Sequence, residues 1–191
     1  MHRGVCVFCS SSDAVDARYF AAAEALGKLL ADRDFPLVYG GTKVGLMGAL
    51  ARSVLAHHGA VFGVLPKRLH AKGIGLDEGS GEILLTEDMR QRKAVMEERA
   101  GGFIAMPGGF GTLEEVLEIL TLRQLGFHQR PVVFLDIDGF WRPLMDLFEH
   151  VYRERFAKPS FRRHYHLAPT PAEAVAYLED YEPDAVEEKW F

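Results

Sequence analysis

The residues with the clearest capacity for chemistry in this 191-residue chain lie in one short segment, residues 107–115, which reads PGGFGTLEE. It follows an apolar run at 102–106 and opens an amphipathic stretch, so it predicts a turn from a strand into a helix. Its three glycines allow the backbone to approach a ligand closely. The start of a helix adds unpaired N–H groups and the positive end of the helix dipole, which favour an anion such as phosphate. Because Glu115 stands one turn inside the helix, the segment predicts a phosphate site beside a carboxylate.

Thr112 and Glu115 also fit a second interpretation, the capping box. In this motif a Thr at the helix N-cap binds the N–H group three residues later, and a Glu at that position reaches back to the N–H of the cap. The spacing of Thr112 and Glu115 matches the motif. A cap needs no glycine-rich anion site in front of it. We therefore expect Thr112 to be both cap and ligand contact, and Glu115 to matter as a carboxylate.

A basic cluster at residues 89–93, Met-Arg-Gln-Arg-Lys, opens the helical stretch that precedes this segment. On a helix, positions 89, 92, 93 and 96 share one side. We therefore expect Met89 and Arg92 to face a common cleft while Arg90 and Gln91 point elsewhere. The alternative is a basic helix face in solvent.

A second glycine-rich turn lies at residues 39–48 and contains Gly40 and Gly41. It lacks the G-x-G-x-x-G pattern, and the next apolar run ends without the acidic residue that usually holds the ribose of NAD. It also lacks the G-x-x-x-x-G-K-[ST] pattern of nucleoside triphosphate binding. Two interpretations remain, a ligand-binding turn and a turn whose glycines serve only tight packing.

The composition and the cysteines exclude several classes of function. The net charge of −5 and the pI near 5.9 give no general attraction for nucleic acid or for anionic membranes. No apolar run reaches the roughly 20 residues that span a bilayer, so we expect a soluble cytoplasmic protein. Cys6 and Cys9 form a C-x-x-C string, but no second pair completes a zinc site. We expect buried, reduced thiols on opposite faces of a strand, and no metal.

Short apolar runs alternate with helical patterns along most of the chain. The expected strands are residues 4–9, 36–39, 60–65, 83–85, 102–106 and 131–135, and the expected helices are 16–33, 45–58, 88–100, 112–126, 140–156 and 171–180. Runs that are nearly free of charge are typical of strands buried on both faces of a parallel sheet. The pattern predicts an α/β fold, a Rossmann-like doubly wound parallel sheet with helices on both faces, in which ligands bind at the carboxyl ends of the strands.

The chain shows no linker or internal repeat, so we expect one domain over residues 1–181 and a tail at 182–191. The longest irregular stretch is residues 66–82. A loop of that length is often functional, for example as a lid, but an ordinary mobile insertion is an equal alternative.

Three elements in this order resemble one known family: a glycine-rich turn, Met-x-x-Arg-Lys and PGGxGTxxE. Nearly the whole chain is similar to the Lonely Guy family, the cytokinin riboside 5′-monophosphate phosphoribohydrolases, which older annotation often named lysine decarboxylases. The resemblance implies hydrolysis of the N-glycosidic bond of an N6-modified adenosine 5′-monophosphate, with release of the free base and ribose 5-phosphate. It also implies a homodimer that needs no metal or cofactor.

The resemblance also implies roles for residues at matching positions. Arg92 and Glu115 match the catalytic pair, with Lys93 beside them. The expected substrate-binding residues are Ser10, Gly40, Gly41, Met89, Arg92, Lys93, Gly108, Gly109, Phe110, Gly111, Thr112, Leu113, Glu114, Glu115 and Thr121.

The chain departs from the family pattern at four places. Ser10 and Thr42 stand where glycines are usual, Arg90 replaces a common His, and the stretch 66–82 lacks an expected Glu. The last two bear on the choice of base more than on the reaction. A broader purine or pyrimidine monophosphate nucleosidase therefore stays open. So does a non-catalytic nucleotide-binding or carrier protein of the same fold, although the intact pair of Arg92 and Glu115 disfavours it. Lysine decarboxylation generally uses pyridoxal phosphate on a Schiff-base lysine, and no such setting appears around Lys28, Lys43, Lys67 or Lys93.

Overall fold

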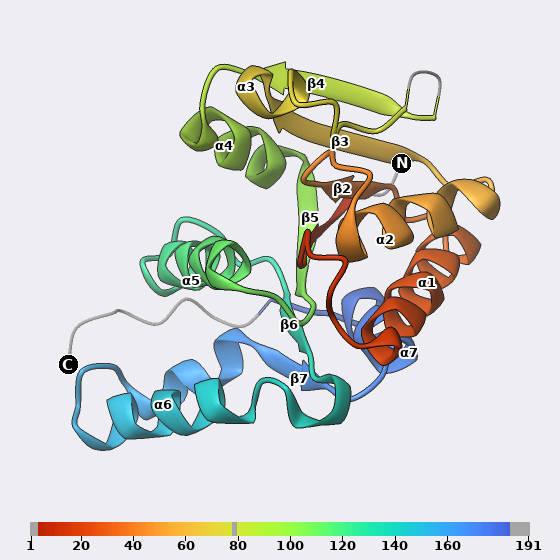
Figure 1. The fold of residues 1–191 in the computed structure, drawn as a ribbon. Coiled ribbons are helices and arrows are strands. Elements are labelled where there is room, and N and C mark those ends of the chain that lie inside the picture. The colour runs from red at the N-terminus through yellow and green to blue at the C-terminus, as the bar shows by residue number, and fades with distance from the viewer. Residues whose placement is uncertain (1–3, 78–79, 184–191) are drawn as a thin grey trace.

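The computed structural model describes residues 4–77 and 80–183, and the strands among them form one parallel sheet (Figure 1). The order across the sheet is β4-β3-β2-β1-β5-β6-β7. The strand bounds are β1 Gly4–Phe8, β2 Leu37–Tyr39, β3 Val61–Pro66, β4 Glu82–Thr86, β5 Ala100–Ala105, β6 Val132–Leu135 and β7 His166–Ala168. This arrangement confirms the doubly wound α/β fold predicted from the alternation of apolar runs and helical patterns.

The strand order reverses next to β1. The chain lays down β2, β3 and β4 outward on one side of β1 and then returns to place β5, β6 and β7 on the other side. Phe8 of β1 pairs with Ala105 of β5, so these two strands end side by side. In open α/β sheets such a reversal opens a crevice at the carboxyl ends of the strands, where ligands bind.

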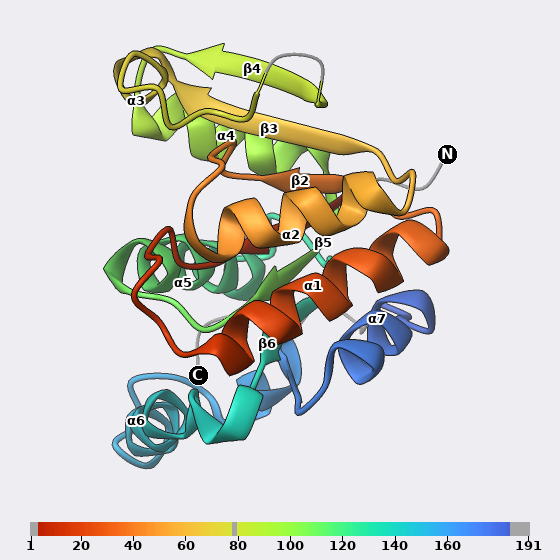
Figure 2. The same cartoon turned by 45° about the vertical axis from the view of Figure 1, so that its right-hand side comes forward.

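Helices cover both faces of the sheet, as expected. Their bounds are α1 Ala17–Asp32, α2 Gly45–Ala56, α3 Lys67–His70, α4 Met89–Arg99, α5 Phe110–Gln124, α6 Arg142–Arg153 and α7 Pro171–Glu179, with 3₁₀ turns η1 Ile137–Gly139 and η2 Pro159–His164. Helices α1, α2 and α7 pack on one face (Figure 2), and α4, α5 and α6 pack on the other. Among these helices, none has the length and apolar character that a membrane crossing requires.

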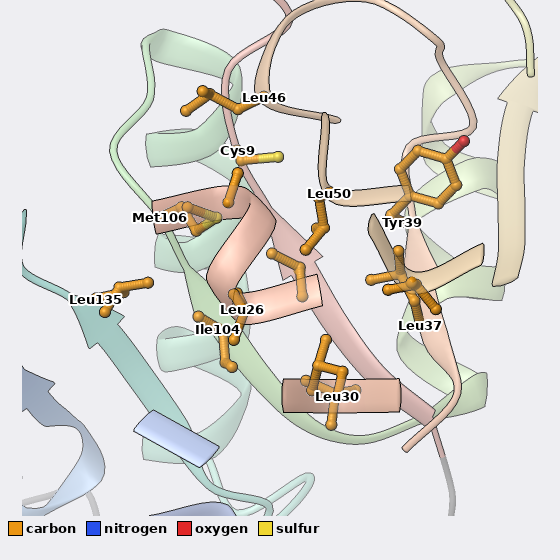
Figure 3. Packing of buried hydrophobic residues seen from close by; sticks show 14 of the residues in the cluster. Cys9, Leu26, Leu30, Leu37, Tyr39, Leu46, Leu50, Ile104, Met106 and Leu135 are labelled. Atoms are coloured by element: carbon orange, nitrogen blue, oxygen red, sulfur yellow. The ribbon is translucent and has the colours of Figure 1, made fainter. Parts of the chain in front are cut away.

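Each central strand sends alternate side chains into the two hydrophobic layers. Cys9, just after β1, lies in the layer under α1 and α2 (Figure 3), whereas Cys6 lies in the opposite layer. Both cysteines are free and buried, and burial raises the pKa of both thiols well above its usual range. The prediction of buried, reduced thiols on opposite faces is confirmed.

Several elements differ from the sequence-based expectation. Strand β7 was not expected, because its three residues are too short to give a pattern. Strand β4 lies at the edge of the sheet and is only partly buried, so the expectation of strands buried on both faces is wrong there. The stretch 66–82 contains the short helix α3 and the start of β4. The expected tail at 182–191 lies almost entirely outside the described residues.

The capping box is the clearest correction. Helix α5 begins at Phe110, two residues before the expected start, and its N-cap is Gly109, whose backbone is extended and which offers no side-chain cap. Thr112 is therefore the third residue of the helix rather than its cap. Glu115 lies beyond the first turn and cannot reach back as the motif requires. Gly109 is the last extended residue before the helix, so it occupies the N-cap position that the Thr-x-x-Glu spacing assigned to Thr112.

Candidate active site

A cleft of about 490 Å³ lies at the carboxyl ends of β1, β2 and β5, where the strand order reverses. Its volume falls within the roughly 300–1,000 Å³ of typical small-molecule sites. Nine of the residues predicted from the sequence line it: Ser10, Gly40, Met89, Arg92, Gly109, Phe110, Gly111, Thr112 and Glu115. The fold thus brings the glycine-rich segment, the basic cluster and the second glycine-rich turn to one place.

The amino-terminal end of α5 forms one wall of the cleft. The N–H groups of Phe110, Gly111 and Thr112 belong to the first turn and have no partner within the helix. A Cβ added at Gly109 or Gly111 would meet no protein atom within 4 Å, so this backbone is open to a ligand. No acidic side chain lies in the first turn to compete for the helix dipole. This wall can bind an anion.

Gly108 has a different role from the two glycines that follow it. A Cβ at Gly108 would lie 2.1 Å from the Oγ1 atom of Thr112. Glycine at this position therefore leaves room for the buried Thr112 side chain beneath the turn.

Arg92 and Glu115 form a buried ion pair at the inner end of the cleft. Arg92 Nη1 donates to Glu115 Oε1 at 2.5 Å, and Arg92 Nε donates to the backbone carbonyl of Val64 at 3.0 Å. Both residues are only 5% exposed. Burial raises the pKa of Glu115, and the neighbouring guanidinium partly opposes that rise. The result is a carboxylate held in a fixed orientation beside an anion-binding helix end.

Helix α4 positions Arg92. Its N-cap is Asp88, whose carboxylate accepts a hydrogen bond from Gln91 N–H at 2.8 Å. Since Arg92 and Met89 lie one turn apart on this helix, both face the cleft as the spacing predicted. Arg90 lies outside the cleft, also as predicted, and lines a neighbouring cavity.

Lys93 does not face the cleft. Its ammonium pairs with the carboxylates of Glu114 and Glu118, and it lines a second cavity of about 290 Å³ between α4 and α5. Burial alone would lower the pKa of Lys93, but the hydrogen bonds to these two carboxylates outweigh it and raise that pKa. Glu115 borders both cavities, so it separates the cleft from this charged neighbour.

Gly41, Leu113 and Thr121 are also absent from the lining of the cleft. Gly41 has a φ of 75°, and its carbonyl accepts a hydrogen bond from Leu76 N–H at 3.0 Å. Leu113 packs against the hydrophobic layer under α5. Thr121 lies farther along α5, where its hydroxyl donates to the Leu117 carbonyl at 2.7 Å.

Sequence reasoning missed part of the wall opposite α5. The missed lining residues are Cys9, Ser11, Ser12, Thr42, Val44, Met47, Leu69 and Ile74. Leu69 and Ile74 belong to the stretch 66–82, which is tied to the second glycine-rich turn by the backbone bond from Lys43 N–H to the Ile74 carbonyl. The length of that stretch was a signal for function, but nothing in its composition indicated which residues enter the cleft.

Within the described ranges, no group of three or more His, Cys, Asp or Glu side chains is placed to hold a metal ion.

Comparison with known proteins identifies the family. A family model described as "Possible lysine decarboxylase" matches residues 47–178. A probable cytokinin riboside 5′-monophosphate phosphoribohydrolase of Oryza sativa subsp. japonica is 46% identical over 183 residues, which cover 95% of this chain and 74% of that protein. A cytokinin riboside 5′-monophosphate phosphoribohydrolase of Arabidopsis thaliana is 46% identical over 182 residues, which cover 94% of this chain and 82% of that protein. The chain belongs to this family, the Lonely Guy proteins.

Comparison with solved structures shows a similarity of this chain in fold alone. The molybdenum cofactor carrier protein of Chlamydomonas reinhardtii superposes with a TM-score of 0.69 at 20% identity and covers 94% of this chain and 97% of its own. The molybdenum cofactor binding protein of Rippkaea orientalis gives the same values. This Lonely Guy protein therefore shares its architecture with proteins whose names refer to a different ligand, the molybdenum cofactor.

Proposed function

We propose that this protein hydrolyses the N-glycosidic bond of N6-modified adenosine 5′-monophosphates, releasing the free base and ribose 5-phosphate. The observation that carries the proposal is the buried pair of Arg92 and Glu115 beside the open amino-terminal end of α5 in a single cleft. The names of the relatives from rice and Arabidopsis support the same reaction.

The proposed phosphate site is the backbone of Gly109, Gly111 and Thr112. Their N–H groups and the helix dipole bind the 5′-phosphate, so the ribose is held against the inner end of the cleft. Binding energy from this remote group then lowers the barrier at the glycosidic carbon, because it fixes the ribose next to the reacting groups.

Glu115 is the proposed electrostatic centre of the reaction. Breaking the glycosidic bond develops positive charge on the ribose, and a fixed carboxylate stabilises that charge. Arg92 keeps Glu115 oriented through Nη1, and its guanidinium partly opposes the rise in the pKa of Glu115 that burial causes. In this scheme Arg92 is a positioning residue, because it acts through the carboxylate of Glu115.

The base is proposed to lie toward the apolar wall. Four apolar side chains line the cleft: Met47, Leu69, Ile74 and Met89. An N6-substituent that is apolar gains free energy by leaving water for such a wall. A broader nucleoside monophosphate nucleosidase would use the same catalytic pair and would differ only in the residues that contact the base.

A decisive assay offers the protein AMP, N6-isopentenyl-AMP and lysine in separate reactions and follows the release of base or cadaverine. We expect base release, with N6-isopentenyl-AMP preferred over AMP. Equal rates on all monophosphates would favour the broader nucleosidase, and no release by a folded protein would refute hydrolysis. We expect no cadaverine, because no lysine lines the cleft among the described residues and lysine decarboxylation generally uses a Schiff-base lysine.

We further propose that the protein is a cytoplasmic homodimer. Apolar side chains are exposed on α5, α6 and the segments that follow them: Leu117, Leu125, Phe127, Leu147 and Phe156. Large apolar side chains exposed to solvent favour a protein interface. Light scattering after gel filtration tests the dimer, and Phe127→Glu with Phe156→Glu is expected to yield monomers. Two free buried thiols fit a reducing compartment.

A further inference from the structure

The turn between β2 and α2 lines the cleft, but the first N–H groups of α2 are already used by the chain itself. Gly45 N–H donates to the carboxylate of Asp13 at 2.9 Å, and Met47 N–H donates to the Ser10 carbonyl at 3.3 Å. Both acceptors belong to the loop after β1. These two N–H groups at the start of α2 are therefore unavailable to a phosphate, and the glycine at the start of this turn needs another explanation.

Gly40 lies directly against the guanidinium of Arg92. A Cβ at Gly40 would stand 2.1 Å from Arg92 Nη2 and 2.9 Å from Met47 Sδ, whereas ordinary contacts begin near 3.4 Å. Gly40 is not among the glycines with positive φ, so its backbone conformation does not demand glycine. What requires glycine at this position is the space that Arg92 occupies.

Arg92 cannot move aside freely. Its Nε atom donates a hydrogen bond to the Val64 carbonyl in β3, and its Nη1 atom donates to Glu115. A methyl group at Gly40 would push Nη2 away and rotate the planar guanidinium, which loosens at least one of these bonds. Met47 is unbranched and flexible, so it can adjust at lower cost.

We propose that Gly40 is a positioning residue: because it has no side chain, the Arg92 guanidinium can pack against its backbone and keep its hydrogen bond to Glu115. The Arg92 side chain then contacts three elements: the turn after β2, strand β3 and helix α5. The catalytic part of this inference rests on the function proposed above, since it assumes that Arg92 and Glu115 carry out the reaction.

The kinetic test is Gly40→Ala. A displacement of about 1 Å in a positioned group can cost about a hundredfold in rate, so we expect kcat to fall about a hundredfold with KM nearly unchanged. The acid limb of the kcat profile also moves to higher pH, because Arg92 lowers the pKa of Glu115 and the variant weakens that effect. The other charged or titratable groups that act on Glu115 are Lys93, Glu114, Cys6 and Cys9. An unchanged acid limb would overturn the proposal.

A thermal test separates this inference from the proposed function, since it needs no substrate. Melting temperatures are compared for the wild type, Gly40→Ala, Arg92→Ala and the double variant. Because Arg92→Ala removes the atom that the new methyl group meets, Gly40→Ala should lower the melting temperature of the wild type and leave that of Arg92→Ala nearly unchanged. Equal losses in both backgrounds would overturn the proposal. If Gly40→Ala alone does not fold, recovery of the fold in the double variant supports the proposal, and failure to recover refutes it.

Gly102→Ala is the matched control. Gly102 lies in β5 outside the cleft, and its Cβ would meet Leu178 Cδ2 and Pro131 Cγ at 3.0 Å. This variant introduces a milder crowding in the same sheet without touching Arg92. We expect the same loss of melting temperature in both backgrounds, unchanged kcat and an unchanged pH profile.

Discussion

Replacing Glu115 by Gln tests the central carboxylate while preserving its shape. Glu115 is 5% exposed, and its Oε1 atom accepts a hydrogen bond from Arg92 Nη1 at 2.5 Å. The amide oxygen of Gln can accept the same bond, so the variant removes the negative charge and little else. A carboxylate that stabilises the developing ribose cation is lost, whereas the backbone of the α5 amino-terminal end is untouched.

The expected magnitudes follow from this geometry. A positioned acid or base group contributes about 10²–10⁴-fold to a rate, so we expect kcat to fall about a thousandfold, or about 4 kcal/mol in activation free energy. Breaking a buried ion pair outright costs about 3–5 kcal/mol of stability. Gln keeps the hydrogen bond but leaves the buried guanidinium of Arg92 without a counter-charge, so we expect the free energy of unfolding to fall by about 3 kcal/mol, at the lower end of that range.

The assay combines single-turnover release of base from N6-isopentenyl-AMP with calorimetric binding of ribose 5-phosphate. Glu115→Gln should lose turnover while keeping its affinity for ribose 5-phosphate within about threefold. Glu118→Gln is the matched control, since Glu118 lies one turn later on α5, faces Lys93 and is outside the cleft. Turnover by Glu115→Gln within tenfold of the wild type, in a folded protein, would refute the catalytic role of the carboxylate.

Three further predictions follow from the same structure. Arg92→Lys loses the Nε bond to Val64 and weakens the hold on Glu115, so the pKa of Glu115 rises and the acid limb of the kcat profile moves to higher pH. Gly111→Ala adds a methyl group that meets no protein atom within 4 Å, so it should raise the free energy of unfolding by about 0.5–1 kcal/mol and raise KM where the ligand approaches. Burial lowers the pKa of His128 to about 4. The unfolded chain therefore binds an extra proton between pH 6.5 and 4, and stability falls by about 1–3 kcal/mol as the pH drops through this window. His128→Gln should remove that dependence in urea titrations, and an unchanged slope would contradict it.

The architecture and the central groups of the site could be predicted from local patterns in the sequence. Short apolar runs separated by helical patterns fixed a parallel sheet with helices on both faces, because period and burial are properties of local sequence. The one-turn spacing of Met89 and Arg92 placed both on one face of a helix. The glycine-rich segment before Glu115 predicted an anion site, since these residue types act through the local backbone.

The neighbours that these groups contact could not be predicted in this way. Adjacent residues on a helix point about 100° apart, so the sequence could not tell that Arg92 enters the cleft while Lys93 pairs with carboxylates outside it. The start of α5 at Phe110 depended on the backbone of Gly109 and removed the capping box. Gly40 and Arg92 are in contact although more than fifty residues separate them in the sequence. Contacts of that kind are set by how the helices and strands pack, which no local pattern in the sequence encodes.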